Sequence, residues 1–198
     1  MAYCDSPLDN LGASCAAIEK IAGVAARIYV GKVRDIDPEE LTFGVDGSIT
    51  AFELLTGKNL YTAESKIWKN AGRSSLVVNE NGPNTFTHAF DFVAYAFDQA
   101  DILAIQQLAL ADQLFIIAEL NSGQLKAYGI AHKAGLTLNF QNFGLKASSN
   151  EETTGVVMSD DNTNKLTLEG SIPNLPQLFK PLTALATNLT DLDAMVAA

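Results

Sequence analysis

The sequence has little of what usually reveals a protein's chemistry. It contains two cysteines, Cys4 and Cys15, whose spacing fits no zinc or redox motif. Its two histidines, His88 and His132, fall on different expected strands, and neither has a catalytic partner nearby in the sequence. No phosphate-binding glycine loop, dinucleotide fingerprint or nucleophile elbow occurs. We therefore expect no catalytic residue, no cofactor and no enzymatic activity.

Basic residues are also scarce. The 198-residue chain has 13 Lys and Arg against 23 Asp and Glu, which gives a formal net charge of −10. Tight binding of nucleic acid depends on Lys and Arg that displace counterions from phosphates, so this balance argues against a protein that grips DNA. The same charge balance is compatible with a protein along which DNA slides, because an anionic wall repels phosphate.

Long apolar runs are missing as well. The most apolar stretch, residues 102–120, is interrupted by Gln106, Gln107, Asp112, Gln113 and Glu119. It is therefore not expected to span a membrane. The first ten residues are polar and acidic, unlike a secretory signal peptide. These features predict synthesis in the cytoplasm and no membrane partner.

One acidic string imitates a metal site. Residues 160–164 read DDNTN, which resembles the opening of a calcium loop. The glycine needed at the sixth position is Lys165 and the glutamate needed at the twelfth is Ser171. The string is better explained as an acidic turn, so we expect no metal site.

What the sequence does contain is a series of β-strand patterns. The pair Asp46 and Gly47 between apolar runs is a strong hairpin signal. Asp98 or Asp101 starts the one clear helical pattern, over residues 98–110. Strands are expected at residues 26–33, 40–45, 48–55, 73–78, 85–97, 113–120, 124–130, 136–140 and 164–171.

The stretch NENGPNTFTHAFDFVAYAF, residues 79–97, is dense in aromatic side chains. It predicts either a ligand-binding groove or a strand that needs a partner on both sides. At thirteen residues the strand is longer than the usual five or six. Alternation places Phe86, Phe90 and Phe92 on one face, towards a core, and Thr87 and Asp91 on the other.

The region around residues 56–72 is basic and holds the one tryptophan. It is either a solvated loop with an aromatic anchor or an arm that projects onto an acidic neighbour. The candidate contact residues of such an arm are Lys58, Lys66, Trp68, Lys69 and Arg73.

The overall prediction is a mainly β protein, a sandwich or barrel of about eight strands with one flanking α-helix. Residues 1–25 form an N-terminal segment, 26–171 the β-domain, and 172–198 a C-terminal extension. The extension begins at a proline-broken connector and becomes Ala- and Leu-rich with helical spacing, so it is expected to be partly helical.

This order of elements resembles the tail-tube proteins of tailed bacteriophages and the related tubes of contractile injection systems. The likeness is carried by ARIYVGKV, GSITAFELL, RSSLVVN, residues 79–97, the helix at 98–110, QLFIIAEL and NKLTLEGS. The likeness extends over residues 26–171. It rests on the order of the elements and on their residue composition, with no signature motif.

The resemblance implies a virion structural protein that forms hexameric rings, which stack into a tail tube through which DNA passes. Its partners would be further copies of itself and other tail or connector proteins. Under this hypothesis Thr87, Asp91 and Glu119 face the channel. The alternatives are a head–tail adaptor or stopper of the virion, a monomeric β-barrel that binds a small apolar ligand, and an enzyme with scattered catalytic residues.

Overall fold

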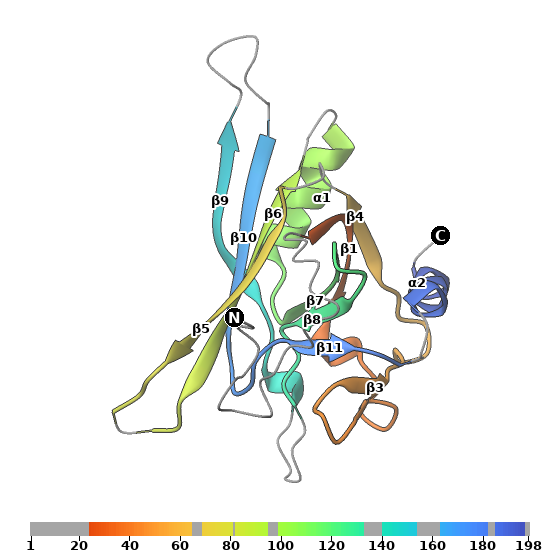
Figure 1. Cartoon of the computed structure of the whole chain (residues 1–198). Helices are drawn as coiled ribbons and strands as arrows, with labels where there is room; N and C mark the ends of the chain where they lie inside the picture. The colour runs from red at the N-terminus through yellow and green to blue at the C-terminus, as the bar shows by residue number, and fades with distance from the viewer. Residues whose placement is uncertain are drawn as a thin grey trace, which may run out of the picture.

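The computed structural model describes residues 24–64, 69–80, 82–94, 99–132, 140–153, 163–181 and 185–196. These residues form two β-sheets and two α-helices, with short 3-10 turns between them (Figure 1). The predicted mainly β fold with a flanking helix is confirmed.

The larger sheet has seven strands in the order β2-β3-β11-β8-β7-β1-β4. Its centre is built from antiparallel neighbours, since β7 pairs with β1 on one side and with β8 on the other. The strands are β1 (Val24–Lys32), β2 (Thr42–Phe43), β3 (Ile49–Ala51), β4 (Tyr61–Glu64), β7 (Leu114–Leu120), β8 (Leu125–Tyr128) and β11 (Gln177–Phe179).

The smaller sheet has four strands in the order β5-β6-β10-β9, and all of its pairings are antiparallel. Its strands are long: β5 (Ala71–Val77), β6 (Thr85–Ala94), β9 (Lys146–Thr153) and β10 (Thr163–Ile172). In Figure 1 the β5–β6 hairpin and the β9–β10 pair extend past the body of the molecule at opposite ends.

Two apolar cores lie on the two faces of the seven-stranded sheet. One fills the space between the sheets and contains Phe90 and Phe92 of β6, Leu166 and Leu168 of β10, and Ile116 of β7. The other lies on the far face of the larger sheet and includes Tyr29, Phe115, Ile117, Phe52 and Leu192. The larger sheet is thus buried on both faces, and the smaller one on a single face.

Two α-helices cover the sheets. Helix α1 (Gln99–Leu110) follows β6 and inserts Ile105 into the core between the sheets. Helix α2 (Leu185–Ala194) packs Leu192 into the second core. The 3-10 turns are η1 (Val33–Asp35) and η2 (Phe140–Asn142).

The expected faces of β6 are confirmed. His88, Phe90, Phe92 and Ala94 are buried in the interior, and Phe86 is half-buried, as the alternation predicts. The aromatic residues within β6 therefore pack in or beside a core and do not line a groove. Residues 95–97 of the expected strand lie outside the described part of the chain.

The remaining strands and the helix follow the expected order, with β2, β3 and β8 shorter than expected and β1, β5 and β10 slightly longer. The Asp46-Gly47 hairpin forms, with Gly47 at φ +78°, but its strands cover only Thr42–Phe43 and Ile49–Ala51. The expected strand at residues 136–140 falls on a stretch that the structure does not describe, apart from residue 140. Strands β4, β9 and β11 were not expected.

The segment after Ser171 is closely integrated with the rest of the fold. It holds the expected helix, α2, and also β11, which lies between β3 and β8 in the larger sheet. Leu192 is 1% exposed in the second core. Of the expected N-terminal segment, residues 1–23 lie outside the described part, and residues 24 and 25 begin β1.

Candidate assembly face

The outer face of the four-stranded sheet is the candidate site, since no other described element packs on it. Its side chains alternate with those of the core and form rows across the strands. Many of them carry hydroxyl groups: Ser75, Thr85, Thr87, Ser149, Thr163, Thr167 and Ser171. Three are cationic and three anionic: Arg73, Lys146 and Lys165, with Asp91, Glu151 and Glu169.

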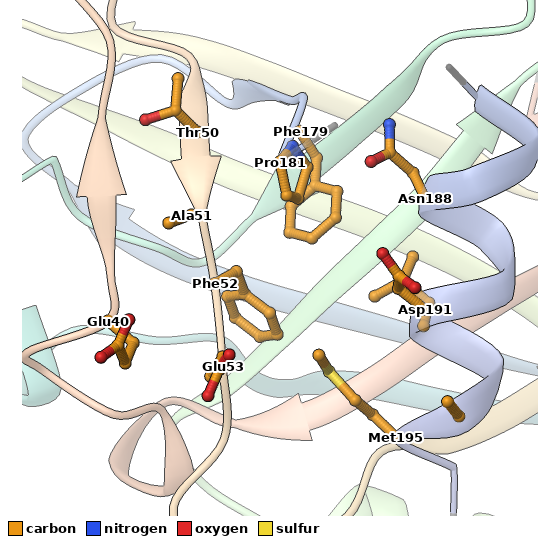
Figure 2. Close-up of a pocket in the computed structure, with 12 residues that line it drawn as sticks. Glu40, Thr50, Ala51, Phe52, Glu53, Phe179, Pro181, Asn188, Asp191 and Met195 are labelled. Atoms are coloured by element: carbon orange, nitrogen blue, oxygen red, sulfur yellow. The ribbon is translucent and has the colours of Figure 1, made fainter. Parts of the chain in front are cut away.

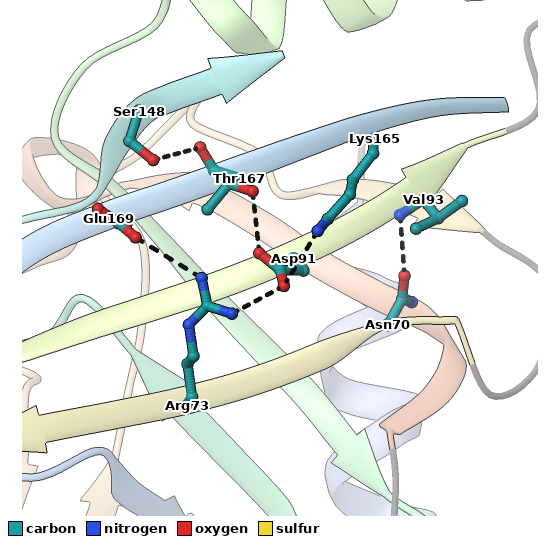
Figure 3. A network of polar contacts seen from close by, with 8 residues as sticks. All are labelled: Asn70, Arg73, Asp91, Val93, Ser148, Lys165, Thr167 and Glu169. Carbon is teal, nitrogen blue, oxygen red and sulfur yellow. Dashed lines mark hydrogen bonds and ion pairs between the residues drawn. The ribbon is translucent and has the colours of Figure 1, made fainter. Parts of the chain in front are cut away.

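Asp91 is the centre of a polar network on this face (Figure 3). One carboxylate oxygen, Oδ2, lies 3.0 Å from Arg73 Nη1 and 3.7 Å from Lys165 Nζ. The other, Oδ1, accepts a 2.9 Å hydrogen bond from the Thr167 hydroxyl. Glu169 lies 3.7 Å from Arg73 Nη2. The charges of Arg73, Lys165, Asp91 and Glu169 therefore compensate one another within one subunit.

This network adds partners that the expectation for Asp91 did not include. The residue is on the outer face of the sheet, as predicted, but it is only 7% exposed. Arg73, which was assigned to the projecting arm, lies on the neighbouring strand and is one of its ion-pair partners. A carboxylate with two cationic partners does not act as a free anionic group.

Thr87 lies on the same outer face, opposite Ser75 of β5 and Ser171 of β10. It is half-buried. A neighbouring pair of hydroxyls, on Thr85 and Ser171, is 3.1 Å apart and hydrogen-bonded. Thr87 thus belongs to a row of small polar side chains that crosses three strands.

Glu119 is not part of this face. It lies on β7 in the larger sheet, on the same side of the strand as Phe115 and Ile117 of the second core. Asp91 and Glu119 therefore lie on opposite sides of the molecule, and no single face of one subunit carries Thr87, Asp91 and Glu119 together. That these residues face a channel stays a prediction.

The described residues of the predicted arm do not form one projecting segment. Lys58 lies 3.5 Å from Asp35 of η1, and Arg73 belongs to β5. Lys69 is exposed and has an interaction within the chain. Lys66 and Trp68 lie outside the described residues. The described basic residues therefore contact their own subunit.

The edges of the four-stranded sheet are a feature that the sequence patterns did not reveal. Among the described residues β5 pairs only with β6, and β9 pairs only with β10. Residues 73–77 and 148–152 are exposed along these edges, although α1 approaches β9. At the start of β9 the sheet is joined to the larger one, because Leu114 and Leu145 exchange both backbone hydrogen bonds.

His88 has a structural role. Its ring is fully buried, and Nδ1 accepts a 3.2 Å hydrogen bond from the Gly129 backbone N–H. Nε2 therefore carries the hydrogen and donates to the carbonyl of Asn174 at 2.6 Å. Burial lowers the pKa of His88 to about 4. The neutral ring ties β6 to the larger sheet and to the connector before β11.

A second polar cluster fastens α2 to the larger sheet. The Tyr29 hydroxyl donates to Asp193 Oδ1 at 2.7 Å, and Arg27 Nη2 lies 2.6 Å from the same oxygen. Burial, and then the hydrogen bond to Asp193, raise the pKa of Tyr29. Glu119 adds a smaller electrostatic contribution in the same direction.

A pocket of about 440 Å³ opens between β3 and α2 (Figure 2). Apolar side chains of Phe52, Phe179, Leu192 and Met195 line it, and three carboxylates, from Glu40, Glu53 and Asp191, also contribute. This lining suits an apolar ligand that carries a cationic group.

Other chemistry finds little support in the described part of the chain. It contains no cluster of three or more His, Cys, Asp or Glu suited to a metal. None of the described helices has the length and apolar character needed to cross a membrane. Cys4 and Cys15 lie outside the described residues.

Comparisons with family models, with curated proteins and with solved structures each returned no match.

Proposed function

We propose that this chain is a virion structural protein that assembles into rings, hexameric as the resemblance implies, and that the rings stack into a tail tube for DNA passage. The protein acts by assembly and not as an enzyme. It is made in the host cytoplasm and ends in the tail, next to other tail or connector proteins.

The observation that carries this proposal is the pair of exposed edges on the four-stranded sheet. Because the sheet has an even number of antiparallel strands, its edge strands β5 and β9 run in opposite directions. In a cyclic ring every copy has the same orientation, so β9 of one copy meets β5 of the next in antiparallel register. Closure of the ring removes both edges.

The face that such a barrel turns inwards suits a conduit. The core side of the sheet is occupied by the larger sheet, so the hydroxyl-rich outer face becomes the channel wall. Its three cationic side chains are matched by three anionic ones. A wall without an excess of cations gives DNA phosphates few places to bind, so the polymer stays mobile.

The test uses two proline variants of the β5 edge, Ser74→Pro and Ser75→Pro. Ser74 pairs with His88 and Ser75 with Thr87. In an antiparallel pair adjacent residues alternate, so one of these two N–H groups points to β6 and the other points away from the sheet. Proline at the first removes a bond within the subunit, and proline at the second removes a bond between subunits.

We expect one variant to keep the stability of the wild type and lose the rings, as seen by negative-stain microscopy. The other variant serves as the control and is expected to lose stability. If both variants form normal rings, β5 is not an assembly edge.

A head–tail adaptor or stopper is the nearest alternative, since it would use the same ring. Assembly separates the two functions: a tube component makes stacks of rings, whereas an adaptor makes single rings. A micrograph of the purified protein over a range of concentrations distinguishes them.

The pocket at α2 favours a second candidate function, a monomer that binds a small ligand. Its three carboxylates beside apolar side chains suit an alkylammonium compound. This function predicts a 21.1 kDa monomer at all concentrations. It also predicts saturable binding of dodecylammonium that Asp191→Asn weakens, with Asp35→Asn as the control.

A further inference from the structure

The two ends of the smaller sheet each carry exposed aliphatic side chains. At one end is the tip of the β5–β6 hairpin, where Leu76, Val77 and Val78, just before the polar stretch of residues 79–84, are 54%, 38% and 69% exposed. Leu76 and Val77 are consecutive strand residues, so they point to opposite faces. A hairpin that ends in solvent normally carries polar residues on both faces, so this tip has the character of a contact surface.

At the other end is helix α1. Its Ile105 is buried, yet Ile102, Leu103 and Leu110 are 45%, 48% and 79% exposed. Leu103 and Leu110 are two turns apart and share one face of the helix. No charged residue occurs between residues 102 and 111. The solvent side of the helix is therefore uncharged and mixed: Gln106 and Gln107 are exposed between Leu103 and Leu110. Three large aliphatic side chains exposed on a twelve-residue helix give this face the character of a contact surface.

These two surfaces do not meet within one subunit. The tip precedes β6, and α1 begins five residues after β6 ends. The ten residues of β6 separate them by roughly 33 Å at 3.3 Å per residue. Figure 1 shows the tip at the lower end of the molecule and α1 at the upper end. A contact between tip and helix therefore joins two copies related by a shift along the strand direction.

We propose that the β5–β6 tip of one copy docks on the exposed face of α1 of a second copy in the adjacent ring, and that this contact stacks the rings. The inference rests on the ring proposed above and identifies the surfaces that join one ring to the next. The contact is heterologous, so it repeats without closing and produces a filament.

The size of the two surfaces fits a contact between rings and not between free monomers. Three partly exposed aliphatic side chains on each side fall far short of the roughly 800 Å² per partner that specific interfaces bury. A ring presents the same contact once per subunit, and the copies act together because they are linked. Stacking is therefore expected only after rings have formed.

The test uses two variants at highly exposed positions, Val78→Glu in the tip and Leu110→Glu in α1. Each is expected to form rings and to make no tubes, because a carboxylate meets an apolar surface without a partner. The matched control is Val45→Glu, in the β2–β3 turn, where the wild-type side chain is fully exposed and tubes are expected to persist.

A mixture of the two preformed variant rings is the decisive sample. Rings of Val78→Glu keep an intact helix face, and rings of Leu110→Glu keep an intact tip. One ring of each kind should join, and the outer surfaces of that pair are both altered. We expect particles of two rings, at least tenfold more frequent than in either variant alone, by electron microscopy.

Other outcomes overturn the inference in distinguishable ways. Tubes formed by either variant alone, or a mixture that contains only single rings, contradict the tip-to-helix contact while leaving the ring itself intact. Double rings in a single variant indicate tip-to-tip or helix-to-helix contacts and also contradict it. A wild-type protein that stays monomeric contradicts the proposed ring and, with it, this inference.

Discussion

The two sheets of this molecule differ in what surrounds them. The seven-stranded sheet has an apolar core on each face, and residues 114–118 of its interior strand β7 are all buried. The four-stranded sheet has one buried face, one polar face and two exposed edges. The comparison separates two roles: the larger sheet contains most of the buried core, and the smaller one carries the edges that we propose join neighbouring copies.

The largest expected effect is a deletion in the larger sheet. Phe115 is fully buried and packs edge-on against Phe52, with ring centroids 5.6 Å apart. We expect Phe115→Ala to lower the free energy of unfolding by about 3–5 kcal/mol. Ser75→Ala on the smaller sheet should change it by about 0.5 kcal/mol or less. Chemical denaturation checks both, and equal effects would remove the distinction between the sheets.

His88, whose hydrogen bonds tie β6 to the larger sheet, should make the stability of the fold sensitive to acid. The pKa of His88 is lowered from 6.5 to about 4 by burial, so between these values the unfolded chain binds a proton that the folded chain does not. The stabilisation is complete above pH 6.5 and is lost as the pH falls to about 4. At 1.36 kcal/mol per pKa unit, this loss is about 3 kcal/mol.

Denaturation curves over this pH range test the prediction. The two charged or titratable neighbours on β8 are Lys126, which also disfavours the imidazolium, and Tyr128, whose ring lies edge-on to His88. The variant His88→Gln should show a flatter pH dependence than the wild type. An unchanged slope in His88→Gln would show that another group dominates.

On the polar face of the four-stranded sheet, the carboxylate of Asp91 is expected to contribute more stability than any other charged group. Asp91 is almost fully buried and has three partners, whereas Glu169 has one ion pair at 3.7 Å and is half-exposed. Asp91→Ala is expected to lower the free energy of unfolding by about 1–2 kcal/mol, because Thr167 and two cations lose their partner. The control, Glu169→Gln, should change it by about 0.5 kcal/mol or less. Equal effects would show that the network has no centre.

The smallest expected effect concerns the attachment of α2. Asp193 accepts hydrogen bonds from Tyr29 and Arg27, but its side chain is 44% exposed. Solvent screening limits the loss in Asp193→Asn to about 1 kcal/mol or less. Thermal unfolding measures it, with the neighbouring Asp191→Asn as the control. A loss as large as that of Phe115→Ala would mean that α2 determines the stability of the larger sheet.

The sequence predicted the strands that bury one face in regular alternation. Leu166 and Leu168 of β10, and Phe90 and Phe92 of β6, reveal their strands because every second residue enters the core. β9 was not expected because most of it lies at an exposed edge, where no alternation is required. β11 is three residues long and lies between Pro176 and Pro181, which suggested a connector.

The candidate site was harder to predict than the fold. The outward direction of Thr87 and Asp91 followed from the period of the strand, but the partners of Asp91 depend on register between strands. Arg73 is 18 residues away and Lys165 is 74 residues away in the sequence. Glu119 was placed with Asp91 because sequence alternation gives the face of a strand and does not say which side of the molecule that face occupies.

The central claim is that the two edges of the four-stranded sheet join neighbouring copies into a ring. The most direct measurement is electron microscopy of the purified wild-type protein over a range of concentrations, with sedimentation of the same samples. The account predicts closed rings with a central opening and, at higher concentration, stacks of them. A single 21.1 kDa species at every concentration would contradict it.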